Sequence, residues 1–238
     1  MTGSELAVWL NSGLVNLEAA KDELTELDSI AGDGDLGITV ESGAKAVRSA
    51  LEQTSADVTP AEVLRSSGVA FARANPSSFS GLFGGAAVAA ADCVGEVEHL
   101  GVRLALSAGR AAAAFIAARG QSNVGDRTVL DALSPALDAL ESTLLLSGSQ
   151  QLDAVVAAAS GGVELTRTMV PRRGRAAWVG TRCLGSPDAG AVAFLRLMEG
   201  LQSAFEPPRD LPESDLPGAR EGRSGARGSS PGPTRPLM

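Results

Sequence analysis

Apolar residues recur at helical spacing over most of the first 205 residues, and no segment alternates convincingly between apolar and polar residues as a strand would. The first helix is predicted over residues 4–29 from the spacing of Leu6, Leu10, Leu14, Leu17, Leu24 and Leu27. The same spacing predicts further helices over residues 38–54, 59–74, 82–98, 101–118, 126–146, 150–170 and 189–204. Thr59, Pro60 and Glu62 mark a helix start, because they supply an N-cap, a first-turn proline and a capping box. The pattern predicts an all-α chain of about eight helices, with a bend at Pro135.

Four connections between these helices are rich in glycine, serine or acidic residues: residues 28–39, 75–85, 120–128 and 171–190. When helices run up and down, their ends alternate between two faces, so loops separated by an even number of helices share a face. Each of these loops lies two predicted helices beyond the one before it. The sequence therefore predicts that all four loops meet at one end of the molecule.

The first of these loops is unusually acidic. The stretch LDSIAGDGDLG (residues 27–37) places Asp28, Asp33 and Asp35 within eight residues. Three converging carboxylates repel one another unless some are protonated or a metal binds. Hard oxygen ligands on a loop suit Mg²⁺ or Ca²⁺. A solvated acidic turn is the alternative interpretation, since this is also good turn chemistry.

Two other motifs fit this loop poorly. Gly32, Gly34 and Gly37 satisfy the dinucleotide-binding pattern G-x-G-x-x-G, but they follow a predicted helix where that pattern requires a strand. An EF-hand counted from Asp33 would have Ile38 where glycine is needed. The chain also contains no G-x-x-x-x-G-K-[ST] motif, so a nucleotide would not bind as it does in a P-loop protein.

The composition of the chain bears on which partners it can bind and on its compartment. The net charge is −8 and 44% of the residues are hydrophobic, which argues against nucleic acid or an anionic membrane as a partner of the main body. Cys93 and Cys183 have no metal-ligand spacing and are predicted to be buried free thiols in a reducing compartment. No basic leader or apolar run of ~18 residues is present, so a cytoplasmic location is expected.

The composition changes at residue 206. Residues 206–238 contain seven prolines and few large aliphatic residues, and their five arginines balance five acids. Such a segment cannot bury enough apolar surface to order itself. We therefore expect a helical domain over residues 1–205 and a disordered tail over residues 206–238, with docking of the tail on a partner as the alternative.

The other three loops offer ligands for phosphate. Ser77 and Ser78 could present hydroxyls and backbone N–H groups at a helix start, and Arg175 could add a guanidinium. Thr128 and the Asp188–Gly190 turn lie near two further predicted helix starts. Each also has a plainer interpretation: the serines and Asp188 as helix caps, and Arg175 as a solvated charge.

Three segments together resemble one known family, the nucleotide-binding L subunit of dihydroxyacetone kinase (the DhaL family). LDSIAGDGDLG is similar to the acidic metal loop of that family, usually written GDGDHG. VGDRTVLDALSPAL (residues 124–137) is similar to its GDKTMLDAL signature, and GRAAWVGTRCLGSPDAGA (residues 174–191) to its GRASYLGERSxGHxDPGA signature. The resemblance spans roughly residues 5–204.

The resemblance implies an eight-helix antiparallel barrel with a nucleotide at one end. It implies that Asp28, Asp33 and Asp35 hold two Mg²⁺ ions between the protein and the phosphates of ATP or ADP. It implies a separate K subunit that binds dihydroxyacetone and, for a tightly held ADP, a phosphotransferase-system partner; a homodimer is also considered. The nucleotide contacts it implies are Leu36, Gly37, Ile38, Thr39, Ser77, Ser78, Gly120, Thr128, Arg175, Asp188, Ala189 and Gly190.

The chain departs from the family pattern around the nucleotide. Leu36 stands where the family usually has a histidine, and Ser186-Pro187 stands in the region of a second one. Ser80 replaces an expected glycine. These departures keep two alternatives open beside a kinase subunit for a short ketose: a regulatory or adaptor protein that binds nucleotide without turnover, and a kinase subunit for another acceptor, such as a tetrose or a fatty-acid carrier.

Overall fold

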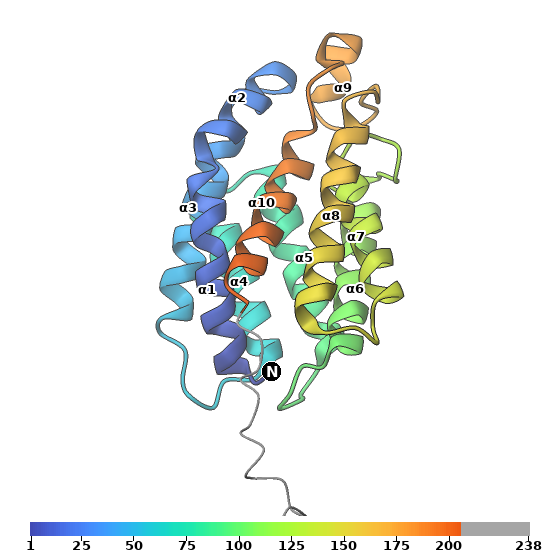
Figure 1. Ribbon diagram of the computed structural model, residues 1–238. Coiled ribbons are helices and arrows are strands. Elements are labelled where there is room, and N and C mark those ends of the chain that lie inside the picture. Colours follow the sequence, from blue (N-terminus) through green and yellow to red (C-terminus); the bar gives the residue numbers. More distant parts are fainter. Residues whose placement is uncertain (206–238) are drawn as a thin grey trace, which may run out of the picture. The chain divides into compact units, whose positions relative to one another are not determined.

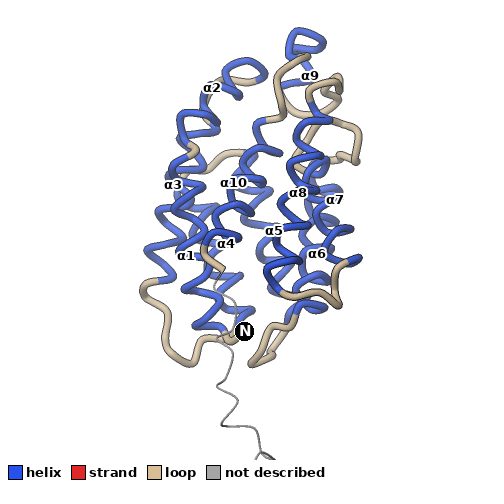
Figure 2. The backbone as a smooth tube through the Cα atoms, viewed as in Figure 1, coloured by secondary structure: helices blue, strands red, loops and turns tan. Residues whose placement is uncertain are grey.

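The structure is a computed structural model that describes residues 1–205 of the 238-residue chain. The predicted tail, residues 206–238, lies outside the described residues. Over residues 1–205 the chain forms ten α-helices and one short 3-10 helix, with no strand (Figure 2). The elements are α1 (Gly3–Ala19), α2 (Lys21–Ala31), α3 (Leu36–Leu51), α4 (Pro60–Ala74), α5 (Ser78–Val94), α6 (Val102–Gly120), α7 (Leu130–Ser142), α8 (Gly148–Thr166), α9 (Ala176–Val179), η1 (Gly180–Cys183) and α10 (Ala189–Ser203).

Eight long helices form a closed barrel. Each packs against the next in the order α1, α3, α4, α5, α6, α7, α8 and α10, and α10 packs against α1 to close the ring. Successive helices of the ring run in opposite directions (Figure 1). Helix α2 continues upward from α1 and packs against α3 and α10. The predicted all-α, eight-helix antiparallel barrel is confirmed, with α1 and α2 together forming its first arm.

The predicted helix over residues 4–29 is wrong in one respect, because it is broken at Ala20. The N–H of Ala20 bonds to the carbonyl of Leu17 at 3.3 Å, three residues back, which tightens the turn and lets α2 tilt away from α1. The bond from Leu24 N–H to the Ala20 carbonyl, at 2.9 Å, then restarts the helix. The leucine spacing continues across this break, so the apolar pattern could not reveal it.

The predicted loop over residues 75–85 is also wrong, because α5 already begins at Ser78. The hydroxyl of Ser77 accepts a hydrogen bond from the N–H of Ser80 at 3.1 Å and caps the helix. Gly84 lies inside α5 at a close crossing with α4, where a Cβ atom on it would stand 2.5 Å from the carbonyl oxygen of Gly68. These glycines permit helix packing rather than a loop.

Two further boundaries differ from prediction. Helix α7 begins at Leu130 rather than at residue 126, because Asp131 folds the preceding turn by accepting hydrogen bonds from the N–H groups of Gly125 (2.5 Å) and Thr128 (2.7 Å). The connection over residues 171–191 contains the short elements α9 and η1. By contrast, the helix start predicted at Thr59 is confirmed, with Pro60 in the first turn and both bonds of the capping box formed with Glu62.

The barrel core is largely aliphatic. A small aromatic cluster of Phe71, Phe79 and Phe83 lies among it, with the rings of Phe71 and Phe83 4.6 Å apart. Both cysteines are free, and Cys183 is buried as predicted. Cys93 is exposed, contrary to prediction, because Ala90, Ala91 and Val94 take the inward positions of that turn of α5. Among the described helices, none has the length and apolar character needed to span a bilayer.

Candidate functional site

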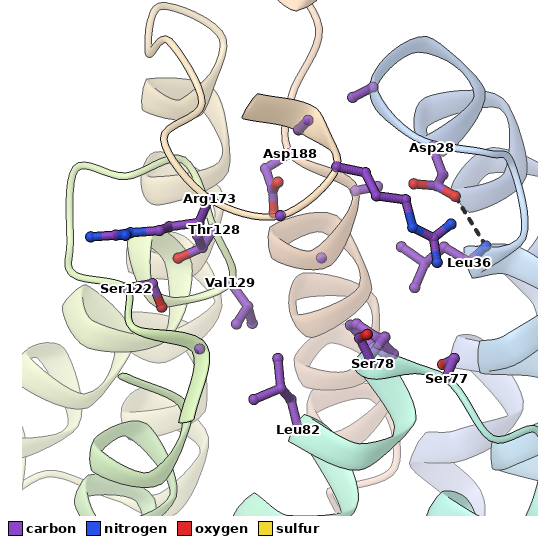
Figure 3. A pocket seen from close by; sticks show the side chains of 18 of the residues that line it. Asp28, Leu36, Ser77, Ser78, Leu82, Ser122, Thr128, Val129, Arg173 and Asp188 are labelled. Carbon is purple, nitrogen blue, oxygen red and sulfur yellow. Dashed lines mark hydrogen bonds between the residues drawn. The ribbon is translucent and has the colours of Figure 1, made fainter. Parts of the chain in front are cut away.

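A cavity of about 750 Å³ opens at one end of the barrel, where the four predicted loops meet. Figure 3 shows Asp28 on one side of it, Thr128 and Arg173 on the opposite side, Asp188 between them, and Ser77, Ser78 and Leu82 below. The predicted convergence of the four loops is therefore confirmed. The predicted site residues that line the cavity are Asp28, Asp33, Asp35, Leu36, Ser77, Ser78, Gly120, Thr128, Arg175, Asp188, Ala189 and Gly190.

Three predicted contacts lie outside the cavity lining. Gly37 is packed against α2, where a Cβ atom on it would stand 2.1 Å from the carbonyl oxygen of Lys21. The side chain of Ile38 is half exposed. Thr39 is buried and its hydroxyl accepts a hydrogen bond from the side-chain amide of Asn75 at 3.1 Å. As ligand contacts these three residues stay predictions.

The acidic wall is formed by Asp28 at the end of α2 and by Asp33 and Asp35 in the loop before α3. One carboxylate oxygen from each lies within 4.8 Å of the other two. Gly34 has a φ of 75°, a left-handed conformation that suits glycine and turns the chain between Asp33 and Asp35. Asp28 accepts a hydrogen bond from the N–H of Leu36 at 3.2 Å, so it is fixed to the first turn of α3 (Figure 3).

This donor set fits a divalent cation. It consists of oxygens only, the carboxylates converge, and both Asp33 and Asp35 are about half exposed and open to the cavity. The guanidinium of Arg175 forms an ion pair with Asp33 and approaches Asp35 to 3.8 Å. A positive group therefore already lies against these carboxylates, as their mutual repulsion requires.

The opposite wall is basic. The segment between Glu164 and Asp188 contains five arginines and no acidic residue. Two of them, Arg172 and Arg173, are tied to the buried carboxylate of Asp126 at 3.8 and 3.3 Å. The N–H of Asn123, together with these two ion pairs, holds the pKa of Asp126 below its usual range. We refer to residues 167–187 as the basic strap.

The floor of the cavity is apolar. It is formed by Leu36, Phe79, Leu82, Ile116 and Val129, which come from four different helices or their entrances. Such a floor can bury a planar or apolar part of a ligand, while the charged walls above it can hold an ionic part. The first turns of α3, α5 and α10 all contribute residues to the lining, so three positive helix ends surround the cavity.

Asp188 lies between the two walls and caps α10. Its carboxylate accepts a hydrogen bond from the N–H of Ala191 at 2.8 Å, which confirms its interpretation as an N-cap. Its own N–H donates to the hydroxyl of Thr166 at 2.9 Å. Burial raises the pKa of Asp188 to about 6, against the opposing effects of the Ala191 hydrogen bond and the nearby charge of Arg127. Asp188 therefore shapes the site and keeps its proton to a higher pH than an ordinary aspartate does.

Sequence reasoning missed several lining residues. Arg119 and Arg173 add positive charge, and Ser122 adds a buried hydroxyl. Arg127 was present in the signature quoted above, yet nothing in its spacing indicated that its side chain is buried. The apolar floor was missed because leucine, isoleucine and valine give no chemical signal beyond helix packing.

The sequence of this chain matches one family model and several characterised proteins. The DAK2 domain family matches residues 30–203. The chain is 31% identical to the L-erythrulose 1-kinase of Mycolicibacterium smegmatis, over 75% of this chain and 32% of that protein. It is 32% identical to the triokinase/FMN cyclase of Rattus norvegicus, over 82% of this chain and 34% of that protein. It thus spans about a third of the length of these relatives.

A shorter relative is covered almost completely. The ADP-binding subunit DhaL of the PEP-dependent dihydroxyacetone kinase of Escherichia coli is 27% identical over 86% of this chain and 98% of its own length. Among solved structures, the dihydroxyacetone kinase from C. freundii in complex with AMP-PNP and Mg²⁺ aligns with a TM-score of 0.66 at 24% identity, covering 84% of this chain and 33% of that chain. That alignment supports the fold alone. The extent of the family match shows that this chain belongs to the DAK2 domain family.

Proposed function

We propose that this chain is the nucleotide-binding module of a phosphotransferase that acts on dihydroxyacetone or a related short ketose. In this proposal it binds ATP or ADP together with Mg²⁺, and the phosphoryl acceptor is held by a separate K-type subunit. Relatives named as kinases of dihydroxyacetone and L-erythrulose support this class of acceptor. The structural neighbour named as a complex with AMP-PNP and Mg²⁺ supports the choice of ligand.

The observation that carries the proposal is the division of one cavity into an acidic wall and an apolar floor. A polyphosphate would be repelled by Asp28, Asp33 and Asp35 unless cations lay between them. Two Mg²⁺ ions, when bound to these aspartates, would neutralise the phosphates and stabilise charge on the transferred group. The apolar floor would then receive the base of the nucleotide.

Several of the other predicted contacts would bind the phosphates of the nucleotide. Ser77 and Ser78 stand at the first turn of α5, where hydroxyl and backbone N–H groups can donate to phosphate oxygens. Arg175 would move from the carboxylates to a phosphate. Asp188, Ala189 and Gly190 would fix the ligand from the first turn of α10. No general base is required from this chain, because the acceptor hydroxyl would lie on the partner.

The partners are proposed from the same relatives. The Escherichia coli relative is named as the ADP-binding subunit of a PEP-dependent dihydroxyacetone kinase, which supports an acceptor site on a separate K-type subunit. The donor would be ATP itself, or a phosphocarrier of the phosphotransferase system that recharges a held ADP. A homodimer is the remaining proposed association.

Isothermal titration calorimetry with Mg·ADP tests the nucleotide site directly. Asp33→Asn should abolish measurable binding while the far-ultraviolet circular dichroism of the helices stays unchanged. Asp138→Asn is the matched control, because Asp138 is an exposed acid on α7 and its one ion pair within residues 1–205 is with Arg110 at the surface. Equal Mg·ADP affinity in Asp33→Asn and the parent chain would contradict the proposal.

Leu36 favours a second candidate function, a nucleotide-binding regulatory or adaptor protein. Leu36 is 7% exposed and forms part of the main core, so its position holds no polar group toward a phosphate. A coupled assay for ADP release, with a K-type subunit and dihydroxyacetone, separates the two functions. Turnover supports the kinase, whereas retained Mg·ADP binding without turnover supports the regulatory protein.

A further inference from the structure

Arg127 is the largest fully buried side chain in the described part of the protein, with 2% of its surface exposed. It lies in the turn before α7 and its backbone has a φ of 61°, a left-handed conformation that is uncommon for arginine. Arg127 is also one of the residues that line the cavity. A buried charge in a strained turn costs free energy, so the interactions of this guanidinium must offset that cost.

The hydrogen bonds of the Arg127 side chain go to two segments, the end of α8 and the turn that leads into α10. Its Nε donates to the carbonyl oxygen of Thr166 at 3.2 Å, at the end of α8. Its Nη2 donates to the carbonyl oxygens of Cys183 (3.2 Å), Ser186 (3.0 Å) and Pro187 (3.4 Å). Its Nη1 donates to the sulfur of Cys183 at 3.3 Å. The guanidinium therefore gathers the end of α8 and the turn over residues 183–187.

Neutral acceptors hold this guanidinium. Within residues 1–205 no carboxylate forms an ion pair with Arg127. An arginine placed only for charge balance would be expected to face an acid, and a carboxylate partner would satisfy at most two or three of its donors. Here the acceptors are backbone carbonyls at the end of α8, at the end of η1 and in the turn that follows η1, so the side chain ties that turn to α8.

The loop that Arg127 holds leads directly into the site. Residues 183–187 precede Asp188, Ala189 and Gly190, which line the cavity at the first turn of α10. Thr166, whose carbonyl accepts from Arg127, also accepts the N–H of Asp188 through its hydroxyl at 2.9 Å. A shift of the turn over residues 183–187 would therefore move Asp188 and the positive end of α10 relative to the acidic wall.

We propose that Arg127 is a positioning residue of the nucleotide site, which holds the turn over residues 183–187 so that the first turn of α10, capped by Asp188, faces the bound phosphates. This inference rests on the proposed nucleotide-binding function. It adds that Arg127 sets the position of the first turn of α10 at the cavity. Arg127 reaches the ligand through the loop, and its nearby charge also favours the ionised form of Asp188.

Cys183 provides a direct measure of the position of this turn. Its side chain is fully buried, and its thiol donates to the carbonyl oxygen of Gly180 at 2.9 Å in addition to its contact with Arg127. Cys93 is the other cysteine of the chain and is exposed, so Cys93→Ser gives a background in which only Cys183 can react. The rate of alkylation by N-ethylmaleimide then reports how often the turn opens.

The experiment compares Arg127→Lys with the parent in the Cys93→Ser background. Lysine keeps the charge but offers three donors from one nitrogen, so it cannot reach carbonyls on both sides. We expect Cys183 to be alkylated about tenfold faster or more, and Mg·ADP affinity measured by calorimetry to fall about tenfold or more, since several charge-assisted hydrogen bonds are lost. The helical circular dichroism should be retained.

Arg182→Lys is the matched control, because Arg182 lies in the same strap and is exposed. Among the described residues, its side chain donates to the carbonyl of Val179 alone, at 3.4 Å. It should change neither quantity. Faster alkylation of Arg127→Lys with unchanged Mg·ADP affinity would overturn the proposal, because Arg127 would then be only structural. Unchanged alkylation would overturn it as well.

A measurement on the unaltered Arg127 keeps the proposal testable should Arg127→Lys fail to fold. Coupling between the turn and the ligand is reciprocal, so saturating Mg·ADP should slow alkylation of Cys183 severalfold in the Cys93→Ser chain. Binding of Mg·ADP without any protection of Cys183 would overturn the positioning role alone. An absence of Mg·ADP binding in the same chain would instead overturn the proposed function and this inference with it.

Discussion

The glycines of the barrel wall and the glycines around the cavity serve different purposes. In the wall, Gly68 and Gly84 face each other across α4 and α5, and a Cβ atom on either would lie 2.5 Å from the carbonyl oxygen of the other. Around the cavity, Gly34 and Gly174 have positive φ values of 75° and 62°, and Gly174 has open space where a Cβ atom would stand. One set permits close packing, and the other permits turns.

The wall glycines therefore help to keep the barrel rigid, whereas the cavity glycines shape the loops that would bind a ligand. Close crossings such as that of Gly68 and Gly84 bring helix backbones together and fix the positions of the helix ends. The turns then carry the charged groups of the site on those ends. Substitutions in the wall should therefore change stability with little effect on ligand affinity in the folded fraction, and substitutions at the cavity should do the reverse.

The largest effect is expected from neighbouring glycines in α8. A Cβ atom on Gly162 would stand 2.1 Å from the carbonyl oxygen of Asp131 in α7, whereas Gly161 has open space at the same position. Gly162→Ala should lower the free energy of unfolding by about 3 kcal/mol, because two backbones must separate. Gly161→Ala should raise it by about 0.5 to 1 kcal/mol through its helix propensity.

Urea denaturation followed by circular dichroism measures both values. Equal effects from the two substitutions would show that the crossing of α7 and α8 is looser than described. A loss of Mg·ADP affinity in folded Gly162→Ala would break the separation between wall and cavity, since this crossing would then transmit strain to the site.

The same distinction explains where the sequence predicted the fold and where it did not. Periodic leucines and caps such as Thr59 located the helices, because they act over one or two turns. Gly84 and Gly85 suggested a loop, and their role became visible only with α4 and α6 packed against them. The sequence alone does not distinguish a glycine at a helix crossing from a glycine in a turn, because the difference lies in whether another backbone packs against it.

The second prediction concerns pH and Asp188. Burial raises the pKa of Asp188 to about 6 from its ordinary value of 3.8. Between these values the native protein holds a proton that the unfolded chain has released, so the contribution of Asp188 to stability is lost as the pH rises from about 4 to about 6. A shift of this size corresponds to about 3 kcal/mol at most. Because Asp188 keeps part of its surface in contact with solvent, we expect roughly 2 kcal/mol.

Asp188→Asn keeps an N-cap and removes the titration, so the difference in unfolding free energy between variant and parent should grow in favour of the variant across this pH range. Chemical denaturation at several pH values measures it. A difference that is constant with pH would mean that Asp188 is solvated like an ordinary surface acid, and its surroundings would then be wetter than its burial indicates.

The site could be predicted only in part, for a related reason. Asp28, Asp33 and Asp35 lie close in sequence, so one short loop brings their carboxylates together, and the helix count placed that loop beside the other three. Arg127 could not be found in this way. Its acceptors lie 39 to 60 residues further along the chain, and only the packed barrel brings them within hydrogen-bond distance.

The third prediction concerns the two walls of the cavity. The guanidinium of Arg175 pairs with Asp33 across the opening, so a divalent cation must displace it to reach the carboxylates. Arg175→Gln should therefore bind Mg²⁺ about fivefold more tightly in the absence of nucleotide, a gain near 1 kcal/mol that is typical of an exposed ion pair. Calorimetry with magnesium chloride measures it, with Arg182→Gln as the control, and a weaker affinity would show that Arg175 supports the metal site.

The smallest effects compare two helix caps, one at each end of the barrel. Thr59 caps α4 far from the cavity, and Ser77 caps α5 at its edge. Thr59→Ala and Ser77→Ala should each lower the free energy of unfolding by about 0.5 to 1 kcal/mol, because each leaves N–H groups of a first turn without their side-chain acceptor. Only Ser77→Ala should also weaken Mg·ADP binding, by about threefold, since its hydroxyl and the turn that it orders face the proposed phosphate position. Equal Mg·ADP affinities in the two variants would mean that Ser77 acts as a cap alone, and the first turn of α5 would then be part of the barrel wall rather than of the site.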